Sequence, residues 1–398
     1  MKRVLISGAG VAGLATAYWL CRYGFDVTVV ERAADLRGAG YAVDIRGAAL
    51  DVLGRMGLTA AARGESTDTL KTTFVDSSGR RVATMNRGFG VVDPNDIEIM
   101  RGDLLRLLYE KTREPLQYIF SDSISLVEQS QQEVRVQFEH GQPRTFDLVI
   151  GADGVHSVTR RLAFDEDASF LRHLGIYMAV FSAPNFLGLE RQQILFNGVG
   201  RVASVKSSRG NADVKVALFF SSDPFQYDRA DVAAQKALVR DAFSSAGWEL
   251  PRLLAAMSAA QDFYFDATCL IRMPQWSRGR VVLVGDACTC VSPFSGQGTG
   301  LALVGAYVLA GELAAAKGDQ AIAFTRYEQL MRPFAQRNQA GAEANAKGFA
   351  PQTPSGVRMR NFALKLMRYL PLTSVMFKMA AREMSRSASA IVPEDYTQ

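Results

Sequence analysis

The feature that most constrains this chain is a glycine-rich turn between a short strand and a helix near its start. Residues 3–7 form an apolar run, Gly8, Gly10 and Gly13 follow, and a helical pattern continues to residue 22. A second apolar run ends at Glu31. This order predicts two parallel strands joined by a helix, a turn that approaches a pyrophosphate, and a Glu31 carboxylate that binds a ribose. The alternative is a glycine-rich turn of another parallel α/β protein.

Two later segments repeat the combination of an apolar strand and a glycine-rich turn. Residues 146–150 lead into Gly151-Ala152-Asp153-Gly154 and a short polar helix, and residues 280–284 lead to Asp286. Beyond Asp286 come Pro293 and the run Gly296-Gln297-Gly298-Thr299-Gly300, which opens another helix. A carboxylate at the end of a strand binds hydroxyls, and a helix N-terminus stabilises negative charge. The first motif alone does not separate NAD from FAD, but these two favour a group with a polyhydroxy chain and an electron-rich ring.

Composition is that of a soluble globular protein of two or three domains, or of one large fold with an insertion. The 398 residues are 48% apolar and 21% charged, unlike disordered or disulfide-scaffold chains. A net charge of +5 is too small to indicate nucleic acid. Four cysteines without a pairing framework fit a reducing compartment, and the apolar stretch 301–310 is too short to cross a membrane. We therefore expect a cytoplasmic protein with neither nucleic acid nor a membrane as its partner.

The spacing of apolar residues predicts an α/β fold in which one domain interrupts another. Leucines at helical spacing predict a helix over 101–113, residues 176–220 alternate β-rich segments with turn residues, and 229–260 are helical in pattern. We expect a discontinuous Rossmann-like domain, an inserted, mainly antiparallel β-sheet domain that binds substrate, and a C-terminal helix that bridges the two. The expected ranges are 1–70, 100–168 and 270–345 for the first domain, 71–99 and 169–269 for the second, and 346–398 for the helix.

The three motifs, in this order, resemble those of the class A flavoprotein monooxygenases, the superfamily of para-hydroxybenzoate hydroxylase. The resemblance covers most of the chain. It implies that Asp153-Gly154 serves flavin and nicotinamide binding, that Asp286 binds the ribityl chain of FAD, and that Arg101 contacts the flavin. FAD is then a tightly but non-covalently bound cofactor, and NADPH or NADH a transient co-substrate. The full set of predicted cofactor contacts is Gly8, Gly10, Gly13, Glu31, Arg32, Arg37, Asp44, Arg46, Arg101, Asp153, Gly154, Asp286, Pro293, Gly296, Gly298, Thr299 and Gly300.

Within this superfamily, residues 40–46 are similar to a segment of the tetracycline-inactivating monooxygenases. In that segment an aspartate contacts FAD, and an arginine seven residues earlier contacts NADPH. The matching positions here are Asp44 and Arg37. A solvent-exposed surface arginine is the alternative reading of Arg37.

The resemblance implies an enzyme that uses NAD(P)H and O2 to hydroxylate an aromatic or polycyclic small molecule through a C4a-hydroperoxyflavin. A tetracycline-like antibiotic or a polyketide is the leading substrate class. Baeyer–Villiger oxygenation on the same scaffold and a non-catalytic flavin-binding partner protein are the alternatives. Flavin halogenases are disfavoured because Trp19, Trp248 and Trp276 are far apart in the sequence. We expect a monomer or a homodimer, and we assign no catalytic residue.

The chain departs from the family pattern beside the third motif. After Ala287 the family usually continues with Ala-His, whereas this chain has Cys288-Thr289-Cys290, and Gly300 stands where many members have Asn. Two cysteines without further ligands do not make a zinc site, so we interpret them as small buried residues and expect no metal. His156 belongs to the second motif, and the alternatives are a position near the cofactor and a surface-loop residue, of which we favour the second. Five aromatic residues are candidates either for a pocket wall or for the core: Phe181, Phe196, Phe219, Phe220 and Phe225.

Basic side chains are concentrated between residues 357 and 386, among apolar ones. One interpretation is a helix that lies on a membrane surface. The favoured interpretation is a helix that braces the two domains, is interrupted at Pro371, and keeps its cations in water.

Overall fold

The computed structural model describes residues 1–36, 40–67, 69–86, 93–114, 116–164, 167–366 and 384–396. The first domain is built on a six-stranded sheet of β1 (Arg3–Ser7), β2 (Asp26–Glu31), β7 (Gln117–Phe120), β11 (Leu148–Gly151), β17 (Ser277–Arg278) and β18 (Val281–Leu283). Their order is β17-β18-β11-β1-β2-β7, and all neighbours are parallel except β17 and β18. All three predicted motif strands are therefore adjacent, and the turns that follow them lie at the same edge of the sheet.

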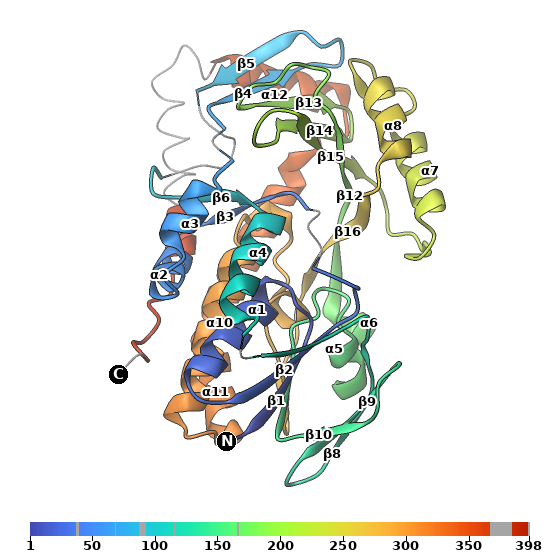
Figure 1. The fold of residues 1–398 in the computed structure, drawn as a ribbon. Coiled ribbons are helices and arrows are strands. Elements are labelled where there is room, and N and C mark those ends of the chain that lie inside the picture. Colours follow the sequence, from blue (N-terminus) through green and yellow to red (C-terminus); the bar gives the residue numbers. More distant parts are fainter. Residues whose placement is uncertain are drawn as a thin grey trace.

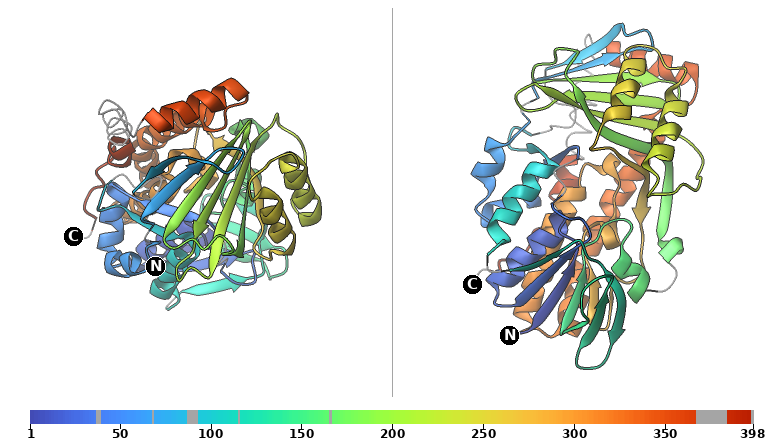
Figure 2. Two further views of the ribbon diagram at one scale, coloured as in Figure 1. Left: turned by 90° about the horizontal axis from the view of Figure 1, so that it is seen from above. Right: turned by 45° about the vertical axis from the view of Figure 1, so that its right-hand side comes forward.

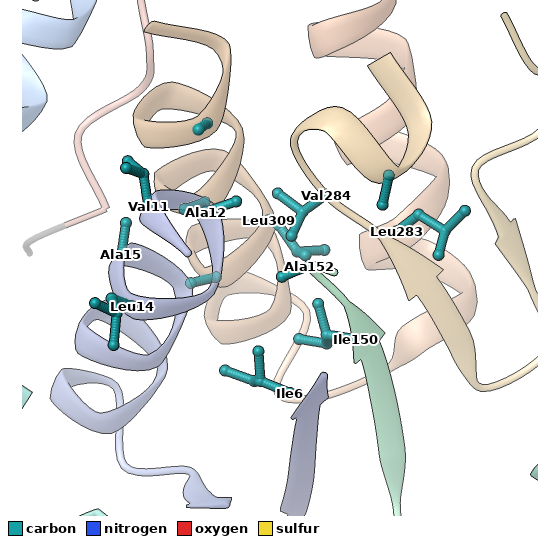
Figure 3. Close-up of a cluster of buried hydrophobic side chains, with 14 of the residues drawn as sticks. Ile6, Val11, Ala12, Leu14, Ala15, Ile150, Ala152, Leu283, Val284 and Leu309 are labelled. Atoms are coloured by element: carbon teal, nitrogen blue, oxygen red, sulfur yellow. The ribbon is translucent and has the colours of Figure 1, made fainter. Parts of the chain in front are cut away.

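Helices cover this sheet and bury its apolar residues. The central pair is α1 (Val11–Arg22) and α10 (Gly298–Ala315), which pack on each other. Ile6 and Ile150 from two neighbouring strands, and Val284 directly after a third, pack in the core beside these helices (Figure 3). By length and composition α10 could span a membrane, but 78% of that window is buried inside the protein, so it is a core helix here. The other helices of this domain are α2 (Ala48–Arg55), α3 (Thr59–Gly64), α4 (Arg101–Thr112), α5 (Val158–Ala163), α6 (Asp167–Phe170), α9 (Asp286–Thr289) and α11 (Gln320–Phe349).

The second domain is a seven-stranded sheet at the opposite end of the molecule (Figure 1). Its strands are β4 (Lys71–Val75), β5 (Arg81–Met85), β12 (Leu171–Pro184), β13 (Gln192–Gly198), β14 (Arg201–Ser207), β15 (Asp213–Ser221) and β16 (Tyr264–Ile271). The order is β16-β12-β15-β14-β13-β4-β5, antiparallel except for the pair of β13 and β4. The helices α7 (Val232–Phe243) and α8 (Leu250–Ala259) cover one face (Figure 2). The single helical pattern expected over 229–260 is thus two helices, separated at 244–249.

The five aromatic candidates for a pocket wall belong mostly to the core of this second sheet. Phe181, Phe196 and Phe220 are almost fully buried there, and Phe225 stacks on Tyr177 in the same cluster. Phe219 lies on the opposite face of β15 and contacts Phe294 and Phe349. None of the five lines the cavity described below. The core interpretation is therefore correct for four of the five, whose side chains belong to the apolar cluster under α7 and α8, and not for Phe219.

Two smaller sheets complete the architecture. One contains β8 (Ile124–Gln129), β9 (Val134–Phe138) and β10 (Arg144–Phe146), and the other pairs β3 (Ala42–Ile45) with β6 (Ile97–Met100). The strand β3 packs against α10, which places residues 42–45 beside the third motif.

Two C-terminal helices lie along the molecule. The long helix α11 packs on α10 and also contacts β12, so it touches both domains. It is followed by α12 (Pro354–Leu366), which lies beside β5. Residues 367–383, with Pro371 and much of the basic segment, are outside the described residues. The predicted fold class is confirmed: a Rossmann-like domain, an inserted and mainly antiparallel sheet, and a C-terminal helix. The domain boundaries stay a prediction.

Candidate functional site

The first glycine motif forms a tight turn between β1 and α1. Gly8 has a φ of +103°, and a Cβ placed on Gly13 would lie 1.9 Å from the carbonyl oxygen of Gly8. The helix can therefore begin this close to the strand only if residue 13 has no side chain. The N-cap residue of α1 is Gly10, which has no side chain to cap the first turn. The N–H groups of that turn have no partner within the helix and are suited to bind a phosphate.

Glu31 ties this turn to the end of β2. Its carboxylate accepts hydrogen bonds from the backbone N–H groups of Ala9, at 2.8 Å, and Ala33, at 2.9 Å. These bonds hold the carboxylate at the turn and leave oxygen lone pairs that a hydroxyl can use. The following residue, Arg32, is exposed, and Arg37 is outside the described residues.

The second motif is a structural junction. Asp153 accepts hydrogen bonds from the N–H and the hydroxyl of Thr159, both at 2.9 Å, and from the hydroxyl of Ser157. Gly154 next to it has a φ of +79°. Arg160 is buried and donates to the carbonyl oxygens of Val155 and Ala287. The Asp153 carboxylate therefore shapes its own turn, and it does not line the cavity.

The Asp286 side chain of the third motif lines a partly open cavity. The side chain is exposed, but the surface it presents lies in a cavity of about 200 Å³. Burial raises the pKa of the Asp286 carboxyl, and the positive charge of Arg101 opposes that shift. Arg101 is the first residue of α4. A Cβ at Gly10 would lie 3.8 Å from its Nη2, so the guanidinium lies beside the first motif while its charge acts on Asp286 of the third.

The cavity lies between residues of the third motif, the segment 41–44 and Val155 on one side and the β domain on the other. Predicted contacts among its lining residues are Asp44, Asp286, Pro293, Gly296, Gly298 and Thr299. The opposite wall comes from β12 and β16 and includes Met178, Tyr264, Asp266 and Thr268. Because Gly298 and Thr299 are in the first turn of α10, the positive end of that helix faces the cavity.

Asp44 and Arg46 form an ion pair below this cavity. Nη2 of Arg46 lies 2.6 Å from the Asp44 carboxylate, and Nε lies 3.4 Å from that of Asp96. A Cβ on Gly296 would be 3.3 Å from Nη1 of Arg46, so the glycine allows the loop to lie close to the guanidinium. Burial raises the pKa of Asp44 to about 6, although Arg46 opposes the shift. Among the predicted contacts, Arg46 and Gly300 lie next to the cavity residues rather than in its lining.

The cysteines of the third motif are buried, as predicted. Cys288 is 1% and Cys290 7% exposed, and their thiols donate to the carbonyl oxygens of Leu283 and Cys269. Burial raises the pKa of the Cys288 thiol to about 12. The Cys288 thiol is therefore neutral. Cys290 is one of the residues that line the cavity.

His156 lies in a loop, as predicted, but it contacts the other domain instead of facing only solvent. Its Nε2 lies 2.7 Å from the carboxylate of Asp266, a residue of the other domain, and only a quarter of its side chain is exposed. The same carboxylate accepts hydrogen bonds from the hydroxyls of Tyr227, at 2.9 Å, and Tyr264, at 3.1 Å. Sequence reasoning missed these partners. The available signal was Asp266 itself, a lone acid within the otherwise apolar run of β16.

The site has the features that FAD requires. It offers a glycine turn at a helix N-terminus for phosphates, a carboxylate in a cavity for hydroxyls, and a second helix N-terminus at that cavity. Within the part of the chain that the structure describes, Oγ of Ser292 and Nε2 of Gln297 are buried without a hydrogen-bond partner. Both belong to the loop around the cavity, and unsatisfied buried polar atoms at such a place are suited to a polar ligand.

Comparison with known proteins agrees with this geometry. Residues 1–342 match the family described as FAD binding domain. The chain is 46% identical to an uncharacterized protein of Mycobacterium tuberculosis over 354 residues, which are 88% of this chain and 95% of that one. It is 40% identical to a flavin-dependent monooxygenase of Legionella longbeachae over 338 residues, with 85% and 87% covered. The solved structure of the tetracycline destructase Tet(51) superposes with a TM-score of 0.87 at 34% identity, covering 100% of this chain and 99% of that one. The chain therefore belongs to the flavin-dependent monooxygenases that are built on this FAD-binding domain.

Proposed function

We propose that this protein uses NADPH or NADH and O2 to hydroxylate an aromatic or polycyclic small molecule. The observation that carries the proposal is the cavity between Asp286 and β16. It provides space for a small molecule between the third motif and the β domain. A substrate in this space is partly shielded from water and lies beside the residues proposed to hold the reactive ring.

FAD, when bound, supplies the oxygen activation that protein side chains cannot perform. The remaining tasks belong to residues of the chain. We assign the pyrophosphate to the N-terminus of α1, the ribose to Glu31, and the ribityl hydroxyls to Asp286. The N-terminus of α10 stabilises negative charge on the ring. The complete proposed set is the one that the motifs and the family resemblance predict, with Arg101, Asp44 and Arg46 as contacts of FAD and Asp153 acting through its turn.

The substrate class is inferred from one relative and from the cavity wall. The tetracycline destructase that superposes on the whole chain is 34% identical to it, which supports a polycyclic polyketide as substrate. Such molecules carry acidic enols and are already electron-rich. The protein then has to position the ring system and exclude water, and the apolar side chains of Val155 and Met178 in the cavity contribute to this.

The test is oxidation of NADPH and of NADH under air by the FAD-loaded protein. The compounds are tetracycline, anhydrotetracycline and 2-hydroxy-1,4-naphthoquinone. We expect at least one to accelerate cofactor oxidation and to give a product heavier by one oxygen atom, with the label of isotopic O2. A new alcohol, identified by NMR, supports hydroxylation, and a new ester or lactone indicates Baeyer–Villiger oxygenation instead. A yellow protein that no compound stimulates, with no oxygenated product, contradicts the proposal.

A further inference from the structure

The cavity wall carries a tyrosine hydroxyl in a fixed orientation. Tyr264, Asp266 and Thr268 alternate along β16, so they project from the same face of the strand, and all three line the cavity. Phe265 points the other way, into the core of the β domain. Tyr264 is 41% exposed, and the cavity receives that surface.

The Asp266 carboxylate determines which way the Tyr264 hydroxyl donates. One of its oxygens accepts from the hydroxyl of Tyr227, at 2.9 Å, and from the backbone N–H of Ala267, at 2.8 Å. The other lies 2.7 Å from Nε2 of His156 and accepts from the hydroxyl of Tyr264, at 3.1 Å. These bonds outweigh burial and lower the pKa of Asp266, so it stays ionised and acts only as an acceptor.

It follows that the Tyr264 hydroxyl presents an acceptor to the cavity. Burial and the negative charge of Asp266 raise the pKa of Tyr264 well above its ordinary value, so the phenol keeps its proton and donates it in a hydrogen bond to Asp266. Its oxygen lone pairs are then available to a ligand that carries a donor. A ligand without a donor at this point displaces water from these lone pairs without replacing its hydrogen bond, which costs binding free energy.

Resting on the proposed function, we propose that Tyr264 is a specificity-determining residue that accepts a hydrogen bond from a phenol or enol hydroxyl of the substrate. Asp266 is its positioning residue, and His156 completes the support from the FAD-binding domain. The binding preference is therefore for hydroxylated rings over their methyl ethers.

The experiment is equilibrium dialysis of the FAD-loaded protein with 1-naphthol and with 1-methoxynaphthalene. We expect the parent protein to bind 1-naphthol about five- to tenfold more tightly, the worth of one buried hydrogen bond. Tyr264→Phe should remove this preference by weakening only the binding of 1-naphthol. Asp266→Asn should reduce it, because the tyrosine hydroxyl loses its ionised acceptor.

Tyr227→Phe is the matched control, since it removes a hydroxyl from the same carboxylate but not from the cavity. It should keep the preference. Equal losses in Tyr227→Phe and Tyr264→Phe would show a role in folding of the cluster and overturn the inference. So would equal affinity of the parent protein for both probes, or no binding of 1-naphthol at about 1 mM.

Loss of FAD affinity in Tyr264→Phe would place this hydroxyl at the cofactor and also overturn the inference. These results are separate from the proposed function. The proposed function stands if the protein oxygenates a polyketide while Tyr264→Phe prefers 1-naphthol over 1-methoxynaphthalene as strongly as the parent does; only the inference then fails. It fails, together with the inference, if the protein takes up no FAD.

Discussion

Nη1 of Arg160 donates a hydrogen bond of 2.7 Å to the carbonyl oxygen of Ala287, and this bond joins the second glycine motif to the third. The guanidinium is 1% exposed and also donates to Val155. The segment that carries Asp286 is therefore anchored by helix α5.

We expect Arg160→Met to lower the free energy of unfolding by about 2–3 kcal/mol, because two buried carbonyl oxygens lose a charged donor. Chemical denaturation with urea measures this. Arg161→Met is the control, since Arg161 is an exposed neighbour that also donates to backbone carbonyls. An equal loss in both variants would contradict the special role of the buried arginine.

Gly13→Ala should destabilise the turn by at least about 2 kcal/mol and prevent retention of FAD, because the new Cβ would overlap the carbonyl of Gly8. Thermal unfolding and the flavin absorbance of the purified protein measure the two effects. The control is Gly341→Ala in α11, where no atom of the described residues, apart from the adjoining backbone of its own helix, lies within 4 Å of the added Cβ. There alanine should be neutral or stabilising. A yellow, stable Gly13→Ala protein would refute the close approach.

Asp286→Ala should weaken FAD binding by about 1–3 kcal/mol, since hydroxyls of the ligand would lose their acceptor. Fluorescence of FAD released on dilution gives the dissociation constant. Asp241→Ala removes an acid that is exposed on α7 and should leave the constant unchanged. Full retention of FAD by Asp286→Ala argues against the assignment.

Asp44 gives the protein without FAD a predictable pH dependence. Its pKa in the folded protein, about 6, is above its ordinary value of 3.8 because burial disfavours the charge. The folded state therefore binds more protons than the unfolded state in this interval, and the contribution of Asp44 to stability falls as the pH rises from 3.8 to about 6.

The free energy of unfolding of Asp44→Asn, relative to that of the parent, should thus be higher at neutral pH than at about pH 4. Urea denaturation of the FAD-free protein at the two pH values measures the difference. A relative stability that moves in the opposite direction would mean that the ion pair with Arg46 outweighs burial.

Cys21 is half-buried, whereas Cys269, Cys288 and Cys290 are buried. We expect a colorimetric thiol reagent to react in the native protein at Cys21 alone, because thiolates form where water reaches the sulfur. Cys21→Ser should abolish native labelling, and addition of urea should expose the other three thiols. Rapid native labelling of Cys21→Ser would show that the cavity opens to the reagent at Cys290.

Motifs confined to a short stretch of chain could be read from the sequence. The turn at Gly8, the acid at the end of β2 and the helix over 101–113 depend on residues close in sequence, and the structure contains each of them. The role of His156 could not be read, because its partner Asp266 is 110 residues away on a strand of the other domain. Asp153 was assigned to the cofactor by resemblance, but its hydrogen bonds within the turn appear only with the backbone in place.

The sequence by itself determined that three strands end in glycine-rich turns, because apolar periodicity and the absence of side chains act locally. Only the tertiary structure decided that these turns share one sheet edge and that β16 closes the cavity opposite them. Strand order and domain packing arise from contacts between residues far apart in the chain, which a local pattern does not encode. For the same reason Tyr264 and Asp266 emerge as candidate substrate-binding residues only from the fold.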